Sequence, residues 1–120
     1  MTDERDLADL DAAKEVRIET RAADGAVHRT IIWVMVEGGE VYIRSYRGPT
    51  ARWYREALER PDVALHVSKR RIPFRAVPAT DAASIAACSA GLERKYRRSY
   101  SLGAMLREDV LGTTLRLDPA

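Results

Sequence analysis

The fold is decided by the stretch from Val41 to Pro61, which reads VYIRSYRGPTARWYREALERP. Its first residues alternate between apolar and polar side chains, a pattern that predicts a strand. Gly48-Pro49 predicts a tight turn, and Thr50 is a candidate N-cap for a helix over Ala51–Arg60. Pro61 ends that helix, because proline has no N–H group and its ring clashes with the preceding turn. The stretch therefore predicts a strand, a turn and a helix in close succession.

This predicted turn combines three guanidinium groups with two hydroxyl groups beside a helix N-terminus. The cations are Arg44, Arg47 and Arg52, and the hydroxyls belong to Ser45 and Thr50. A helix N-terminus attracts anions through its unpaired N–H groups and its partial positive charge, and guanidinium forks match phosphate geometry. We therefore predict a phosphate-binding corner. The alternative is a solvated, arginine-rich connection, since arginine is common throughout this chain.

Length and composition limit the remaining possibilities. With 120 residues the chain predicts one domain, and dimerisation would let so small a domain bury more surface. The formal net charge of +2 is too small to require a nucleic-acid partner. Cys88 is the single cysteine, and no histidine or cysteine pair has the spacing of metal ligands, so we expect neither an internal disulfide nor a metal site. The absence of a signal-like or long apolar run predicts a cytoplasmic protein without a membrane contact.

Hydrophobic periodicity along the rest of the chain predicts mostly strands. Val27–Glu37 is apolar on both faces at its centre, which predicts a central strand covered on each side. The other expected elements are a short, possibly loose helix over 1–14, strands over Glu15–Arg21, Glu40–Arg47, Asp62–Ser68, Ile72–Thr80 and Thr113–Leu117, and helices over Asp81–Arg98 and Ser101–Val110. Consecutive hairpins favour antiparallel pairing. The predicted class is mainly β with helices (α+β): a six-stranded antiparallel barrel with flanking helices.

This order resembles the FMN-binding split β-barrel superfamily, which includes the pyridoxamine-phosphate-oxidase-like proteins and the flavin/deazaflavin oxidoreductases. The residues that carry the resemblance are Ile31–Trp33, Glu37–Ser45, Thr50–Arg52 and Arg60–Leu65. They match an apolar strand that ends near a tryptophan, a glycine turn, a strand that ends in Ser or Thr, and a hydroxyl-x-cation helix start. More narrowly, the sequence looks like a small uncharacterised bacterial family, DUF2255. The resemblance implies a six-stranded split β-barrel.

The resemblance also implies roles for individual residues. Ser45, Thr50 and Arg52 match the positions that hold the cofactor phosphate in such proteins, with arginine here in place of lysine. Trp33 falls on the strand beside the cofactor ring and could stack on it, although a tryptophan in an apolar strand is more often part of the core. Trp53 is expected near the cofactor or the dimer seam. Arg44 and Arg47 flank the same turn.

The function implied is hydride transfer to or from a small organic substrate by a homodimer. The cofactor would be FMN or the deazaflavin coenzyme F-420, which the sequence does not resolve. No catalytic residue is identified, because no general acid or nucleophile arrangement is evident. Two alternatives stay open: a non-redox protein that binds a flavin, deazaflavin, haem or other anion, and a cofactor-free partner-binding module.

Overall fold

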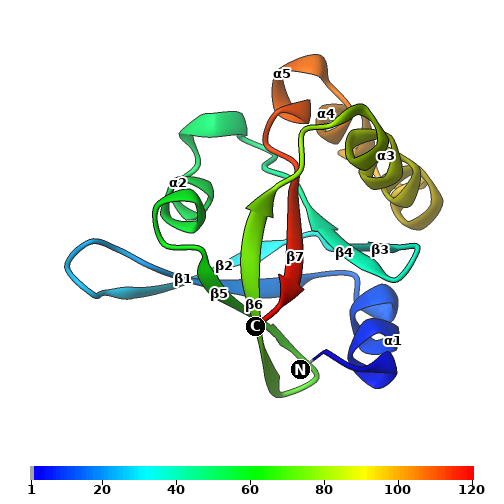
Figure 1. The fold of residues 1–120 in the computed structure, drawn as a ribbon. Helices are drawn as coiled ribbons and strands as arrows, with labels where there is room; N and C mark the ends of the chain where they lie inside the picture. The colour runs from blue at the N-terminus through cyan, green and yellow to red at the C-terminus, as the bar shows by residue number, and fades with distance from the viewer. Residues whose placement is uncertain (1) are drawn as a thin grey trace.

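The computed structural model describes residues 2–120, so Met1 lies outside it. A single sheet of seven antiparallel strands organises this part of the chain, in the order β2-β1-β5-β6-β7-β4-β3 (Figure 1). The strands are β1 (Val16–Arg21), β2 (Val27–Ile32), β3 (Met35–Glu37), β4 (Glu40–Ile43), β5 (Asp62–Val67), β6 (Arg70–Pro78) and β7 (Leu115–Pro119). The predicted fold class is confirmed, with seven strands in place of six.

The sheet curls and brings its two edges near each other where β2 leads into β3. Strands β2 and β3 are the two edge strands, yet only Trp33 and Val34 separate them along the chain. Two residues span no more than about 11 Å from one strand to the next, so the two edges must lie close together. The predicted single central strand over Val27–Glu37 is therefore wrong. Trp33 and Val34 interrupt it, and the two strands on either side, β2 and β3, are the edge strands of the sheet.

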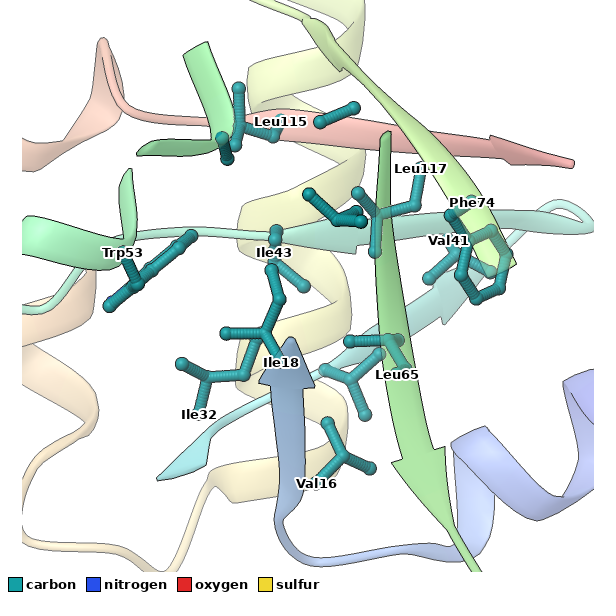
Figure 2. Close-up of a cluster of buried hydrophobic side chains, with 14 of the residues drawn as sticks. Val16, Ile18, Ile32, Val41, Ile43, Trp53, Leu65, Phe74, Leu115 and Leu117 are labelled. Atoms are coloured by element: carbon teal, nitrogen blue, oxygen red, sulfur yellow. The ribbon is translucent and has the colours of Figure 1, made fainter. Parts of the chain in front are cut away.

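The interior of the curl holds the main hydrophobic core. Figure 2 shows labelled side chains from β1, β2, β4, β5, β6, β7 and helix α2 (Arg52–Glu59) converging there. The best buried among them are Ile18, Ile43, Leu65 and Leu115, each 0% exposed. Their burial follows from the strict alternation of the strands, which sends every second side chain inward. This core fixes the strands that carry the corner described below.

A second, smaller core lies between the sheet and helix α3 (Ala82–Tyr96). It contains Met35, Tyr42, Cys88, Leu92, Tyr96 and Met105. Strand β4 is consequently buried on both faces, with the barrel interior on one side and α3 on the other. Asp81 caps α3 by accepting from the N–H of Ser84, in agreement with the predicted helix start.

Several predicted elements differ in detail. The strand expected over Glu40–Arg47 already ends at Ile43, and the strand expected over Ile72–Thr80 runs from Arg70 to Pro78. Gly48–Thr50 forms a 3-10 turn (η1), so α2 begins after Ala51 and Thr50 is not its N-cap. The expected helix over Ser101–Val110 is two short helices, α4 (Leu102–Met105) and α5 (Glu108–Leu111), because Arg107 adopts an extended conformation between them. The last strand starts two residues later than predicted. The hydroxyls of Thr113 and Thr114 donate to carbonyls at the end of α5, which holds both residues in a turn.

Helix α1 (Glu4–Ala12), the short N-terminal helix expected over 1–14, is packed on the barrel. Leu10 is completely buried, and Arg70 pairs with both Asp6 and Asp9. Within residues 2–120, no helix is both long enough and apolar enough to span a membrane.

Candidate functional site

A pocket of about 770 Å³ opens where β4, the η1 turn and the start of α2 meet the break between β2 and β3. Six of the seven predicted cofactor-binding residues line it: Trp33, Arg44, Arg47, Thr50, Arg52 and Trp53. Thr30, Ile31, Tyr46, Arg55, Ser101 and Met105 also contribute, together with Glu15. The lining contains four arginines and one carboxylate, that of Glu15, so the pocket carries a net positive charge that favours an anionic ligand.

Ser45 is the one predicted residue that does not line the pocket. It is completely buried, and its hydroxyl donates to the carbonyl oxygen of Gly48 at 2.7 Å. Its N–H donates to the hydroxyl of Thr113 at 3.0 Å. Ser45 therefore shapes the turn that precedes η1, and the pocket residues are positioned by that turn.

Arg44 supplies a fixed positive charge at the inner wall of the pocket. It is 1% exposed, and its guanidinium donates to the hydroxyls of Thr114 at 2.9 Å and Ser89 at 3.1 Å. It also donates to the carbonyl oxygens of Met105 at 3.0 Å and Ile85 at 3.2 Å. Across residues 2–120, no carboxylate lies within 4.0 Å of this guanidinium. Burial lowers the pKa of Arg44, the expected effect of an uncompensated buried cation.

Arg52 is the exposed counterpart of Arg44 at the pocket mouth. Its side chain is 54% exposed, and its Nε lies 3.9 Å from Oε1 of Glu56 one turn along α2. Its Nη2 donates to the hydroxyl of Thr30 at 3.5 Å. These contacts are long, so the guanidinium can turn toward a bound anion at little cost.

Glu56 remains charged despite its burial. Burial raises the pKa of Glu56, but the Thr20 hydroxyl at 2.7 Å, the His28 imidazole at 3.0 Å and the charge of Arg52 outweigh that effect and leave the pKa lowered. The carboxylate is thus a fixed partner behind Arg52.

The first turn of α2 has no side-chain cap. Its N-cap residue is Ala51, which carries no hydrogen-bonding side chain, and the Thr50 hydroxyl donates instead to the carbonyl of Arg47 at 3.2 Å. The leading N–H groups of this eight-residue helix therefore have no side-chain acceptor, and they lie beside Arg52 and Arg55. Such a terminus is suited to a phosphate.

The two tryptophans occupy different positions. Trp33 is partly exposed and stacks on Tyr96, with 3.9 Å between ring centroids and 3° between planes. Trp53 is 7% exposed and belongs mainly to the barrel core, where it meets Tyr54 edge-on. Trp33 and Tyr46 are therefore the aromatic side chains that the pocket offers to a ligand, and Trp33 is the one held by a stacked neighbour.

Sequence reasoning missed Arg55 and Met105. Arg55 follows Arg52 by three residues on one helix, a spacing that places both on the same face and could have identified it. Met105 comes from α4, far away in the sequence, and no local pattern links it to the corner.

A family model described as "Uncharacterized protein conserved in bacteria (DUF2255)" matches residues 6–117. The chain belongs to the DUF2255 family. A search of curated proteins found no match.

Solved structures similar to this DUF2255 protein share its fold at low identity. A candidate pyridoxamine 5'-phosphate oxidase from Listeria innocua aligns with a TM-score of 0.70 at 14% identity, covering 97% of this chain and 91% of that one. The haem storage protein HutZ from Vibrio cholerae aligns with a TM-score of 0.67 at 15% identity, and the alignment covers 100% of this chain and 92% of HutZ. A candidate 5-nitroimidazole antibiotic resistance protein from Bacteroides thetaiotaomicron aligns with a TM-score of 0.71 at 12% identity, and the alignment covers 98% of this chain and 80% of that one. The expected relation to pyridoxamine-phosphate-oxidase-like split barrels is confirmed for the fold.

Proposed function

We propose that this DUF2255 protein binds a phosphate-bearing flavin or deazaflavin, FMN or coenzyme F-420, and transfers a hydride to or from a small organic substrate. The observation that carries the proposal is the joining of two features in one pocket. An arginine-lined, uncapped helix start offers an anion site, and a partly exposed tryptophan offers a flat aromatic surface. A phosphorylated planar cofactor needs both.

The residues present fit such a cofactor. The phosphate would lie at the α2 N-terminus between Arg47 and Arg52, with the Thr50 hydroxyl alongside, and the ring would lie toward Trp33. Arg44 supplies positive potential from behind without turning. The cofactor, when bound, supplies the hydride chemistry, while the chain binds it, orients it and excludes water.

We also propose that the active form is a homodimer. Ile31 is 56% exposed and Tyr46 is 53% exposed, and both lie on the rim of the pocket. Edge strand β2 has one unpaired side next to this rim. A second copy that covers the rim would bury these apolar side chains and close the pocket.

Non-redox ligand binding is the second candidate. The similar fold of the haem storage protein HutZ favours it, as does the lack of an acid–base pair in the pocket lining. The donor set is less suited to haem. Among the described lining residues there is no histidine or cysteine, so only Tyr46 and Met105 could approach an iron.

The test is titration of the purified protein with FMN, with F-420 and with haem, each followed by its own absorbance or fluorescence. We expect one flavin-type cofactor to bind, and Arg52→Ala to weaken it by about tenfold or more, since a charge-assisted phosphate contact is lost. Arg75→Ala is the matched control, because Arg75 is an exposed arginine that does not line the pocket.

Equal affinity in the Arg52→Ala and Arg75→Ala variants would refute the assignment of the corner. Oxidation of the reduced, bound cofactor by small organic acceptors then separates the enzyme from the carrier. A protein that binds the cofactor but turns over none of the acceptors would favour the second candidate.

A further inference from the structure

Trp33 lies in the gap where the barrel splits. Residues 33 and 34 connect β2 to β3 and pair with no strand in the described sheet. The sheet therefore does not fix the indole, which depends on the side chains packed against it. The ring of Tyr96, at the end of α3, packs parallel against the indole.

Tyr96 is itself held rigidly. It is 5% exposed, and its hydroxyl donates to the carbonyl oxygen of Lys14 at 2.8 Å. The same hydroxyl lies 3.4 Å from both the N–H and the carbonyl oxygen of Val34. The phenol thus joins the end of the N-terminal segment to the residue directly after Trp33.

Lys95, the preceding residue of α3, reinforces this arrangement. Its Nζ donates to the carbonyl oxygen of Val34 at 2.7 Å and to that of Leu10 at 2.9 Å. Two successive residues of one helix therefore hold the backbone of the split. Since Tyr96 does not line the pocket, the surface of Trp33 that meets the pocket is the part that Tyr96 leaves uncovered.

We propose that Tyr96 is a positioning residue: it holds the Trp33 ring flat against the pocket and so prepares the aromatic surface for a planar ligand. An indole without this support gains rotamers, and a ligand would then have to pay the cost of ordering it. The placement of Trp33 stands on geometry alone, whereas the effect on ligand affinity rests on the proposed function.

The first measurement needs no ligand. Protein labelled with 5-fluorotryptophan has two fluorine resonances, from Trp33 and Trp53, which a Trp33→Phe variant assigns. In Tyr96→Leu we expect the Trp33 resonance to shift or broaden, because the ring above it is lost, while the Trp53 resonance stays in place. In Tyr96→Phe, which keeps the ring and loses only the hydroxyl, the Trp33 resonance should shift or broaden less than in Tyr96→Leu, and the Trp53 resonance should stay in place.

Phe74→Leu provides the matched control, since Phe74 is a buried aromatic residue of β6 outside the pocket. An unchanged Trp33 resonance in Tyr96→Leu would overturn the proposal. A shift of equal size in Phe74→Leu would also overturn it, because the effect would then be general loosening.

The second measurement is FMN affinity. We expect Tyr96→Leu to bind FMN about three- to tenfold more weakly than wild type, Tyr96→Phe to lose less affinity than Tyr96→Leu, and Phe74→Leu to stay close to wild type. Equal affinity in Tyr96→Leu and wild type would refute the link to binding. If wild type itself binds no FMN, the proposed function fails, and the fluorine spectra alone still decide the placement of Trp33.

Discussion

At the scale of single residues, the buried cation Arg44 and the half-buried cation Lys95 stand out because, among residues 2–120, neither forms an ion pair with a carboxylate within 4.0 Å. Arg44 and Lys95 both donate mainly to backbone carbonyls or hydroxyls. A buried charge without a carboxylate is costly, so each must contribute something that an apolar side chain would not. Arg44 gives the pocket its permanent positive wall. Lys95 holds the split in the barrel beneath Trp33.

Lys95 should leave a signature in the pH dependence of stability. Burial lowers the pKa of Lys95 to about 8 from an ordinary value of 10.5. Between these pH values the unfolded chain binds a proton that the folded protein has lost, so the free energy of unfolding rises with pH. Urea denaturation at pH 7.5 and pH 9 should show this rise, and the Lys95→Met variant should show a smaller one.

The pH window and the control follow from the neighbouring groups. Burial raises the pKa of Cys88 to about 11 and that of Tyr96 to about 12. These two groups therefore lower the free energy of unfolding as the pH rises, but only above their ordinary pKa values of 9.0 and 10.0. Lys14→Met removes an exposed lysine and should keep the wild-type slope. An identical slope in Lys95→Met and wild type would contradict the assigned role.

At the scale of elements, the packing of α3 on β3 depends on one glycine. A Cβ added at Gly91 would lie 2.9 Å from Cγ of Glu37 and 3.0 Å from Cβ of Met35. Alanine favours a helix over glycine by about 1 kcal/mol, but here the helix would have to move away from the strand. We expect Gly91→Ala to lower the free energy of unfolding by about 1–3 kcal/mol, measured by urea denaturation.

Gly103→Ala is the matched comparison within α4. Nothing lies within 4 Å of a Cβ at that position, so this change should be neutral or stabilise by up to about 1 kcal/mol. If both variants were equally stable, the close contact between α3 and β3 would be refuted.

The elements that the sequence predicted well are those with local signals. Asp81 marks the start of α3, and the apolar faces expected for β1 and β5 are buried, although Glu19 and Ala64 on the opposite faces are buried as well. The break at Trp33-Val34 had no such signal, because an apolar run looks the same whether it crosses a sheet or joins its two edges. Pro73 lies in β6, an inner strand, although proline has no N–H group to donate to a neighbouring strand. The pairing with β7 begins only at Phe74, so Pro73 needs no N–H on that side.

The candidate site was predictable to the same degree. The arginines of the corner are adjacent in sequence, and local reasoning could place them together around a turn. Ser45 was assigned to the ligand because a hydroxyl beside a turn can donate either to a ligand or to the backbone of the turn. Here it donates to the carbonyl oxygen of Gly48. The support of Trp33 by Tyr96 joins residues 63 positions apart, which no periodicity reveals.

At the scale of the whole molecule, the curled sheet leaves its split beside the pocket, and the proposed homodimer covers that side. Sedimentation equilibrium should give twice the chain mass of 13.5 kDa. Ile31→Glu should shift the protein toward monomer, because it places a charge in the buried seam. Leu58→Glu is the control, since Leu58 is an exposed leucine outside the pocket. A monomeric wild-type protein, or an Ile31→Glu dimer as stable as wild type, would contradict this arrangement.

The measurement that tests the central claim most directly is a paired titration of wild-type protein with FMN and with riboflavin. The two molecules share a ring and differ by the phosphate, so their affinity ratio reports on the arginine corner alone. We predict that FMN binds at least about tenfold more tightly, and that added salt narrows the difference because the contact is charged. Equal affinity for the two molecules, at low and high salt, would contradict a phosphate-binding corner.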